Sequence, residues 1–178
     1  MNNILSVFLT NLGKYNEGFL IGEWVNLPIG EAELEKVMER IGIDDEFYEE
    51  TFLTDWESPI RALHRLVGEY SSIEDLNEIV EELENISDDD VDVLNAIYDS
   101  VGNFDTMLQV YKNGDYRIYQ NCYKMEDVAR EYLNEIGAFY GLPDFVEIYF
   151  DFESYGRDMA IEGWFSELDD GTIIQVYC

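Results

Sequence analysis

The order of hydrophobic and polar residues changes period several times along the chain, and each change marks an expected element. Short runs rich in Val, Leu, Phe and Trp predict three strands, at residues 4–10, 19–27 and 50–56. The first two should pair as an antiparallel hairpin across a loop at residues 11–18, where Asn and Gly are frequent. Apolar residues at helical spacing predict a helix over 31–41. Ser followed by Pro at 58–59 predicts the N-cap and first residue of a second, short helix. Residues 1–67 are therefore expected to form a small α+β domain.

The next stretch combines helical spacing with an almost wholly anionic polar face. The apolar residues that recur at this spacing are Ile73, Leu76, Ile79, Val80, Leu83 and Ile86. Between Leu66 and Tyr111 the chain has thirteen carboxylates and no Lys, Arg or His. Like charges three or four residues apart on a helix repel, and N-caps at Ser72 and Ser87 account only for acids in the first helical turns. We expect residues 68–103 to form a central acidic helical domain.

A second α+β pattern occupies residues 104–178. The runs that predict strands are residues 106–111, 116–123, 160–165 and 172–177. The Asn-Gly pair at 113–114, between the first two runs, is a strong hairpin signal. The runs that predict helices are residues 125–140, with Ile136 facing inward, and 143–149, whereas residues 151–159 favour neither period. No linker rich in Pro, Gly or Ser separates the three parts. We therefore expect an α+β fold in an elongated chain of three small domains with short joins.

Composition indicates a folded protein with a large negative charge. The chain has 178 residues and a formal net charge of -30, and 15% of its residues are aromatic. Acidic disordered segments lack aromatic residues, so a packed core is expected. Direct binding to nucleic acid or to an anionic membrane needs a basic face, so the expected partner is instead a basic protein. No secretory signal or membrane-spanning run is visible, and we expect a cytoplasmic protein in which Cys122 and Cys178 are free thiols.

The chain offers few candidates for catalysis or for metal binding. His64 is the only histidine, so neither a nucleophilic triad nor a zinc site is expected, and we interpret it as a partly exposed helix residue. The acidic run that starts at Asp88 lacks the central Gly and the final Glu of a calcium-binding EF-hand loop. Asp151 and Glu153 lie on one side of an expected extended segment and resemble a glycosidase pair, but paired acids are frequent in so acidic a chain. We expect a non-enzymatic protein with no cofactor and no metal.

The charge suggests mimicry of DNA. Duplex DNA carries one negative charge per roughly 1.7 Å of axis, so thirty net charges correspond to about 51 Å, or some fifteen base pairs. Carboxylates fixed in rows on a folded surface would compete for the Lys and Arg residues that normally meet phosphates. The carboxylates expected to bind the partner are Glu74, Asp75, Glu78, Glu81, Glu82, Glu84, Asp88, Asp89, Asp90, Asp92 and Asp99. An acidic module for another basic partner, adaptation to high salt, and an unrecognised hydrolase remain as alternatives.

Three segments resemble the ArdA antirestriction family. They are residues 11–18 followed by Gly22-Glu23-Trp24, residues 69–77, and residues 151–158. The resemblance, which runs through nearly the whole chain, implies a DNA mimic carried on conjugative plasmids or transposons. It also implies inhibition of type I restriction-modification enzymes through their methyltransferase core, and an elongated homodimer of three-domain subunits.

The resemblance extends to a short motif near the C-terminus. The residues that resemble the family's antirestriction motif are Tyr155, Gly156, Arg157 and Asp158, and the likeness implies that they lie near the dimer contact. Arg157 lies among several acids in the sequence. We interpret it either as one half of a local ion pair or as an organising contact at the subunit interface.

Overall fold

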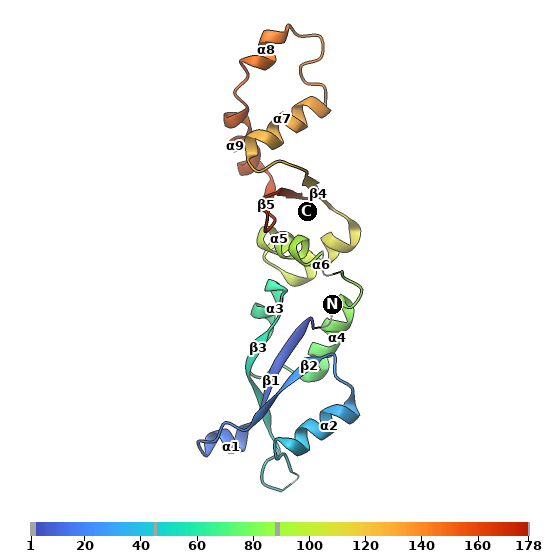
Figure 1. The fold of residues 1–178 in the computed structure, drawn as a ribbon, viewed down its shortest axis with the longest axis vertical. Coiled ribbons are helices and arrows are strands. Elements are labelled where there is room, and N and C mark those ends of the chain that lie inside the picture. Colours follow the sequence, from blue (N-terminus) through green and yellow to red (C-terminus); the bar gives the residue numbers. More distant parts are fainter. Residues whose placement is uncertain (1–2, 45, 88–89, 178) are drawn as a thin grey trace. The chain divides into compact units, whose positions relative to one another are not determined.

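The structure, a computed structural model, describes residues 3–44, 46–87 and 90–177 and has a mixed α+β fold (Figure 1). The chain divides into two compact units, unit 1 (residues 1–91) and unit 2 (residues 92–178). Each unit contains one three-stranded sheet and its own helices. The α+β class is thereby confirmed, whereas the three-domain division at residues 67 and 103 stays a prediction.

Unit 1 is built on an antiparallel sheet with the strand order β2-β1-β3. Its strands are β1 (Leu5–Asn11), β2 (Gly22–Leu27) and β3 (Thr51–Glu57). Successive side chains of a strand point to opposite faces, and Leu5, Val7 and Leu9 of the central strand are buried on one of them. All three predicted strands and the pairing of the first two are confirmed.

The helices of unit 1 are α1 (Leu12–Asn16), α2 (Glu31–Arg40), α3 (Arg61–Leu66) and α4 (Ile73–Leu83). Helix α1 corrects the predicted loop at 11–18. The Asn11 side chain accepts a hydrogen bond from the backbone N–H of Lys14 at 2.9 Å and so caps a short helix. The predicted N-cap at Ser58 is also wrong, because α3 is capped at Ile60 and the Ser58 hydroxyl donates to the carbonyl oxygen of Ile4 at 2.7 Å. The predicted cap of α4 at Ser72 is confirmed.

Unit 2 begins at Asp92, the second residue of helix α5. Its helices are α5 (Val91–Val101), α6 (Phe104–Asn113), α7 (Met125–Glu135), α8 (Asp144–Ile148) and α9 (Phe152–Glu162). Its antiparallel sheet has the order β4-β6-β5, formed by β4 (Tyr116–Tyr119), β5 (Trp164–Glu167) and β6 (Ile173–Val176). Within the described residues, no helix has the length and hydrophobicity needed to cross a membrane.

Helix α6 replaces the strand predicted at 106–111. The Asn103 side chain accepts from the backbone N–H of Thr106 at 3.0 Å and caps the helix, and Gly114 ends it in the left-handed conformation (φ 72°). The predicted hairpin is therefore wrong as well, because β4 has no preceding strand to pair with and pairs instead with β6.

Other boundaries in unit 2 also differ from the predictions. The helix predicted to reach residue 140 ends as α7 at Glu135, and Ile136, predicted to face inward, is 57% exposed. The undecided residues 151–159 lie almost entirely in α9. Helix α9 extends to Glu162, so the strand predicted at 160–165 begins only at Trp164. The short helix predicted at 143–149 is confirmed as α8.

Candidate partner-binding surface

Helix α4 has one buried apolar face and one exposed acidic face. Leu76, Val80 and Leu83 are fully buried. The Asn77 side chain accepts from the backbone N–H of Ile29 at 2.9 Å and donates to its carbonyl oxygen at 2.8 Å, which fixes the rotation of the helix about its axis. The exposed carboxylates of α4 are Glu74, Asp75, Glu78, Glu81 and Glu82. We call these five residues the acidic face of α4.

The acidic face of α4 has a charge density close to that of nucleic acid. Its five carboxylates lie within eight residue steps, which at 1.5 Å per residue is about 12 Å of helix axis, or one charge per about 2.4 Å. Duplex DNA has one charge per roughly 1.7 Å and a single strand one per about 3.4 Å. This one helix therefore presents anions at a density between those of the two forms of DNA.

The two cations of α2 pair with acids on β2 and on α2 itself. Arg40 of α2 donates two hydrogen bonds to the carboxylate of Glu23 at 2.8 and 2.9 Å, and Lys36 lies 3.1 Å from Glu33. These contacts lower the pKa values of Glu23 and Glu33 below the usual range. Glu78, at the centre of α4, is exposed and makes no ion pair with another described residue.

The predicted acids that follow α4 have mixed environments. Glu84 is exposed at the C-cap of α4. Asp88 and Asp89 lie outside the described residues. Asp90 is half-buried, and its carboxylate accepts a hydrogen bond from the Ser87 hydroxyl at 2.6 Å, a contact that orders the start of α5.

Asp92 and Asp99 belong to unit 2, on α5. Both carboxylate oxygens of Asp92 accept from the backbone N–H of Asp169, at 2.9 and 3.0 Å. Asp92 therefore holds the turn between β5 and β6, a role that no local sequence signal reveals. Asp99 is exposed near the end of α5.

The first half of the candidate antirestriction motif packs inside unit 2. Gly156 is buried where α9 crosses α7, and a Cβ at this position would lie 2.3 Å from the carbonyl oxygen of Met125. The Tyr155 ring is half-buried and packs edge-on against Phe150, with 5.9 Å between the ring centroids. These two residues join α9 to the core of unit 2.

The second half of the motif faces solvent. Arg157 and Asp158 are both exposed. The Arg157 guanidinium donates to the Ser154 hydroxyl at 3.2 Å and makes no ion pair with another described residue. Of the two interpretations of Arg157, the geometry gives no support to the local ion pair, and the side chain is accessible to another protein.

The residues considered for catalysis are separated or used structurally. Asp151 is the N-cap of α9 and accepts from the backbone N–H and the hydroxyl of Ser154, which lowers the pKa of its carboxyl. Glu153 lies two residues further along the helix, where side chains do not face each other, so the predicted pair on an extended segment is wrong.

His64 is exposed on α3. Burial raises the pKa of the Cys122 thiol to about 11. Among the described residues, no group of His, Cys and acidic side chains could hold a metal ion.

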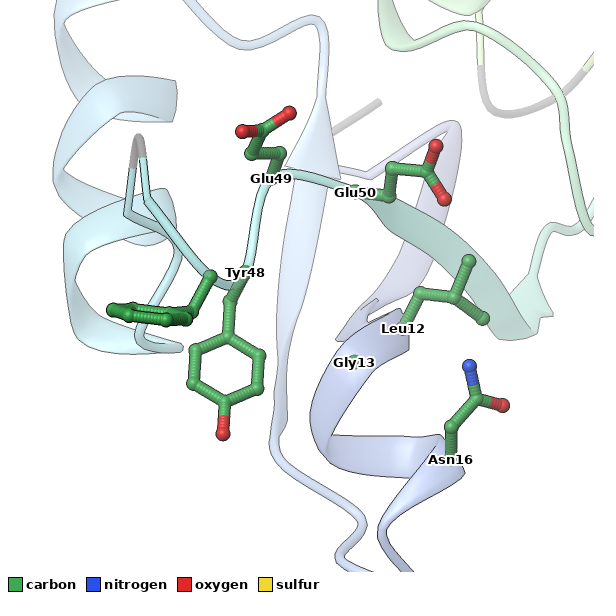
Figure 2. A pocket seen from close by; sticks show the side chains of 7 residues that line it. Leu12, Gly13, Asn16, Tyr48, Glu49 and Glu50 are labelled. Carbon is green, nitrogen blue, oxygen red and sulfur yellow. The ribbon is translucent and has the colours of Figure 1, made fainter.

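A cavity of about 230 Å³ lies between α1 and residues 47–50, and Figure 2 shows the side chains that line it. Tyr48 lines it, and the Tyr48 hydroxyl donates to Glu17 at 2.8 Å and accepts a hydrogen bond from Lys14. Gly13 leaves the space that the Tyr48 ring fills, since a Cβ there would lie 2.4 Å from the ring. Hydrogen bonding to Tyr48 raises the pKa of Lys14 and lowers that of Glu17. Tyr48 therefore ties residues 47–50 to α1 and the residue after it through Lys14 and Glu17.

Comparison with known proteins places the chain in one family. No curated protein matches it. The family model described as antirestriction protein (ArdA) matches residues 7–174, which include most of both sheets and all of α4. Because this match covers nearly all of the 178 residues, the chain belongs to the ArdA family of antirestriction proteins.

Proposed function

We propose that this protein inhibits type I restriction-modification enzymes by occupying the DNA-binding groove of their methyltransferase core with ordered carboxylates. Membership of the ArdA family implies antirestriction activity and interaction with restriction-modification enzymes. The observation that supports mimicry is the acidic face of α4, which is exposed, lacks cations of its own and has the charge density of a nucleic acid.

The physical mechanism is competition for the same Lys and Arg side chains. A DNA-binding groove gathers cations that stabilise phosphates, and fixed carboxylates meet them through charge-assisted hydrogen bonds. Because α4 is anchored by its buried face, docking immobilises little additional backbone. Attraction between the two surfaces also accelerates encounter, and salt weakens it. The protein would act in the cytoplasm of a cell that receives a conjugative plasmid or transposon.

The test is displacement of labelled duplex DNA from a purified type I methyltransferase core. The protein should displace the duplex, and its inhibition should fall steeply between about 50 and 200 mM salt. Binding to the enzyme without displacement of DNA would instead favour the alternative, an acidic interaction module for another basic surface.

Two triple variants separate ordered charge from total charge. In the first, Glu74, Glu78 and Glu82 of α4 become Gln. In the second, the matched control, Glu31, Glu35 and Glu39 of α2 become Gln. Both sets are exposed, share the spacing i, i+4, i+8 and remove three charges. At about 0.2–1 kcal/mol per exposed charge pair, the α4 variant should lose about 3- to 160-fold in inhibition and the α2 variant much less. Equal losses would mean that only net charge matters.

We also propose that the active form is a homodimer joined through unit 2. Several large apolar side chains of this unit are exposed: Ile136, Tyr140, Phe145, Ile148, Tyr149 and Ile161. Exposed apolar side chains in such numbers mark interaction sites. Sedimentation velocity should show a dimer that dissociates in Ile148→Glu/Tyr149→Glu but not in the unit 1 control Phe47→Glu. A wild-type monomer at micromolar concentration would refute this.

A further inference from the structure

A groove crosses the face of the unit 1 sheet opposite to Leu5, Val7 and Leu9. It has a volume of about 450 Å³. Each strand contributes a central side chain to its floor, namely Phe8 from β1, Trp24 from β2 and Asp55 from β3. The register places Phe8 between the other two, because it is paired with Trp24 on one side and with Asp55 on the other. Tyr15 and Glu69 lie at the edges of the groove.

Close packing holds the groove in shape. The Phe8 and Trp24 rings meet edge to face with 5.5 Å between their centroids. The Phe8 ring occupies the space beside Gly22, where a Cβ would lie 2.6 Å from it. At the edge of the sheet, the backbone N–H of Leu53 donates to the carbonyl oxygen of Glu69 at 2.7 Å, which fixes that residue against β3. The aromatic floor and the acidic rim are therefore preorganised.

The groove is open to solvent, and its described lining combines exposed rings with carboxylates. Trp24 is 43% and Tyr15 49% exposed, although rings of this size usually bury most of their surface. Asp55 and Glu69 are exposed beside them. None of the described residues that line the groove is Lys, Arg or His. An aromatic surface next to carboxylates attracts a cation both through the ring face and through the charge.

Elsewhere in the molecule, the same combination is occupied by the protein's own cations. In each case a cation lies over an aromatic ring and pairs with a carboxylate. The three examples are Lys14 over Tyr48 with Glu17, Arg117 over Tyr119 with Glu131, and Arg130 over Phe152 with Glu126, at 3.9, 4.5 and 3.9 Å from the ring centroids. The groove has the ring and the carboxylate without the cation.

We propose that this groove binds an arginine side chain of the basic partner, with the guanidinium against Trp24 and hydrogen-bonded to Asp55. Guanidinium fits this groove better than ammonium, because it is planar and weakly hydrated. It can stack on a ring and donate hydrogen bonds to a carboxylate at the same time. The inference rests on the proposed function for the identity of the partner. It adds a localised anchor of the kind that dominates protein interfaces, an aromatic–arginine contact, to the distributed charge of α4.

The direct test uses the whole protein and no enzyme. N-acetyl-arginine amide is titrated while NMR follows the indole N–H signals, with that of Trp24 assigned from Trp24→Phe. The matched probe is N-acetyl-citrulline amide, which has nearly the same shape and no charge. The arginine probe should shift the Trp24 signal saturably in the millimolar range, citrulline should not, and Asp55→Asn should abolish the shift. Equal shifts with both probes, or no shift at Trp24, would overturn the inference.

The second test separates this inference from the proposed function. In the DNA displacement assay, Trp24→Ala should weaken inhibition about tenfold and leave its salt dependence unchanged, whereas the α4 triple variant should reduce the salt dependence. Asp55→Asn is the second variant, because it preserves the shape of the side chain and tests the anchor even if Trp24→Ala misfolds. Full inhibition by both variants would refute the arginine anchor and leave the mimic intact. Failure of the wild-type protein to displace DNA would refute the mimic, while the arginine titration would still decide the anchor.

Discussion

Neutralising Glu78 should make the protein more stable and a weaker inhibitor. The four positions that neighbour Glu78 on the helix surface, at i−4, i−3, i+3 and i+4, are all acidic: Glu74, Asp75, Glu81 and Glu82. Like-charge pairs at these spacings each destabilise a helix by about 0.2–0.5 kcal/mol. The four repulsions together amount to about 1–2 kcal/mol. Glu78→Gln removes all of them, and Gln has nearly the same helix propensity as Glu.

The assay is urea unfolding of the full chain, followed by circular dichroism at two ionic strengths. At about 0.01 M salt, where charges interact over roughly 30 Å, Glu78→Gln should raise the free energy of unfolding by about 1–2 kcal/mol. At about 1 M salt, where the screening length is about 3 Å, most of this gain should disappear. The control is Glu33→Gln on α2, which removes an acid that pairs with Lys36 at 3.1 Å. It should leave stability unchanged or lower it by at most about 0.5 kcal/mol.

At low salt, therefore, only Glu78→Gln should raise the free energy of unfolding. A Glu78→Gln protein that is no more stable than the wild type would show that repulsion between the α4 carboxylates does not destabilise the fold. A gain that persists in 1 M salt would show that its origin is not electrostatic. If the gain is found but inhibition is unchanged, the repulsion exists without serving the partner.

Three further outcomes follow from particular contacts. Gly156→Ala should destabilise the protein by about 1–3 kcal/mol in thermal unfolding, because the new Cβ would lie 2.3 Å from the Met125 carbonyl oxygen; Gly30→Ala, where a Cβ meets nothing within 4 Å, should cost far less. Asn103→Ala should cost about 1 kcal/mol, because it removes the cap of α6; an unchanged urea midpoint would contradict that role. Cys122, whose pKa is raised to about 11 by burial, should resist iodoacetamide in the native protein at pH 8 and become more reactive as pH rises, as peptide mass spectrometry can measure.

Elements with strong local signals were predictable from the sequence. Helix α4 begins at its Ser72 cap and buries Leu76, Val80 and Leu83, three residues of the predicted apolar stripe. The exposure of its acids follows from the same periodicity. The three strands of unit 1 were likewise predictable, because each is a short run of β-branched and aromatic residues bounded by turn residues.

The region around α6 shows why other elements were missed. The sequence of residues 106–111 alternates well enough for a strand and also fits a helix, and so short a run cannot distinguish the two periods. The outcome depends on the flanking residues, the Asn103 cap and the left-handed Gly114. Asn-Gly was interpreted as a hairpin turn, yet the same pair also ends helices. The true partner of β4 is β6, more than fifty residues away, and no local pattern identifies such a distant strand.

The two candidate surfaces were predictable to different degrees, because one depends on local spacing and the other on the pairing of distant residues. The acidic face of α4 lies within one helix, so local spacing defines it. The groove depends on the pairing of Phe8 with both Trp24 and Asp55, and a register shift between Phe8 and Leu9 sets the second pairing. The sequence signal for the groove was Gly22 in a predicted strand, because a glycine there indicates that another side chain approaches the backbone closely. In the structure Gly22 is paired with Thr10, and the Phe8 ring lies beside it.

The contrast between α2 and α4 argues that the acidity serves a partner rather than adaptation to high salt. The two helices belong to the same unit and differ by only one residue in length, yet α2 places Lys36 and Arg40 among its acids and α4 has no cation. General adaptation to salt would enrich every exposed helix in acids and would make folding depend on salt. A partner surface concentrates the repulsion on one helix and leaves ion pairs such as Arg40–Glu23 elsewhere in place. We therefore expect the wild-type protein to remain folded in 10 mM buffer, with circular dichroism and sedimentation unchanged from 0.5 M salt. Unfolding at low salt would favour halophilic adaptation, because the charge on α4 would then be one part of a general surface property.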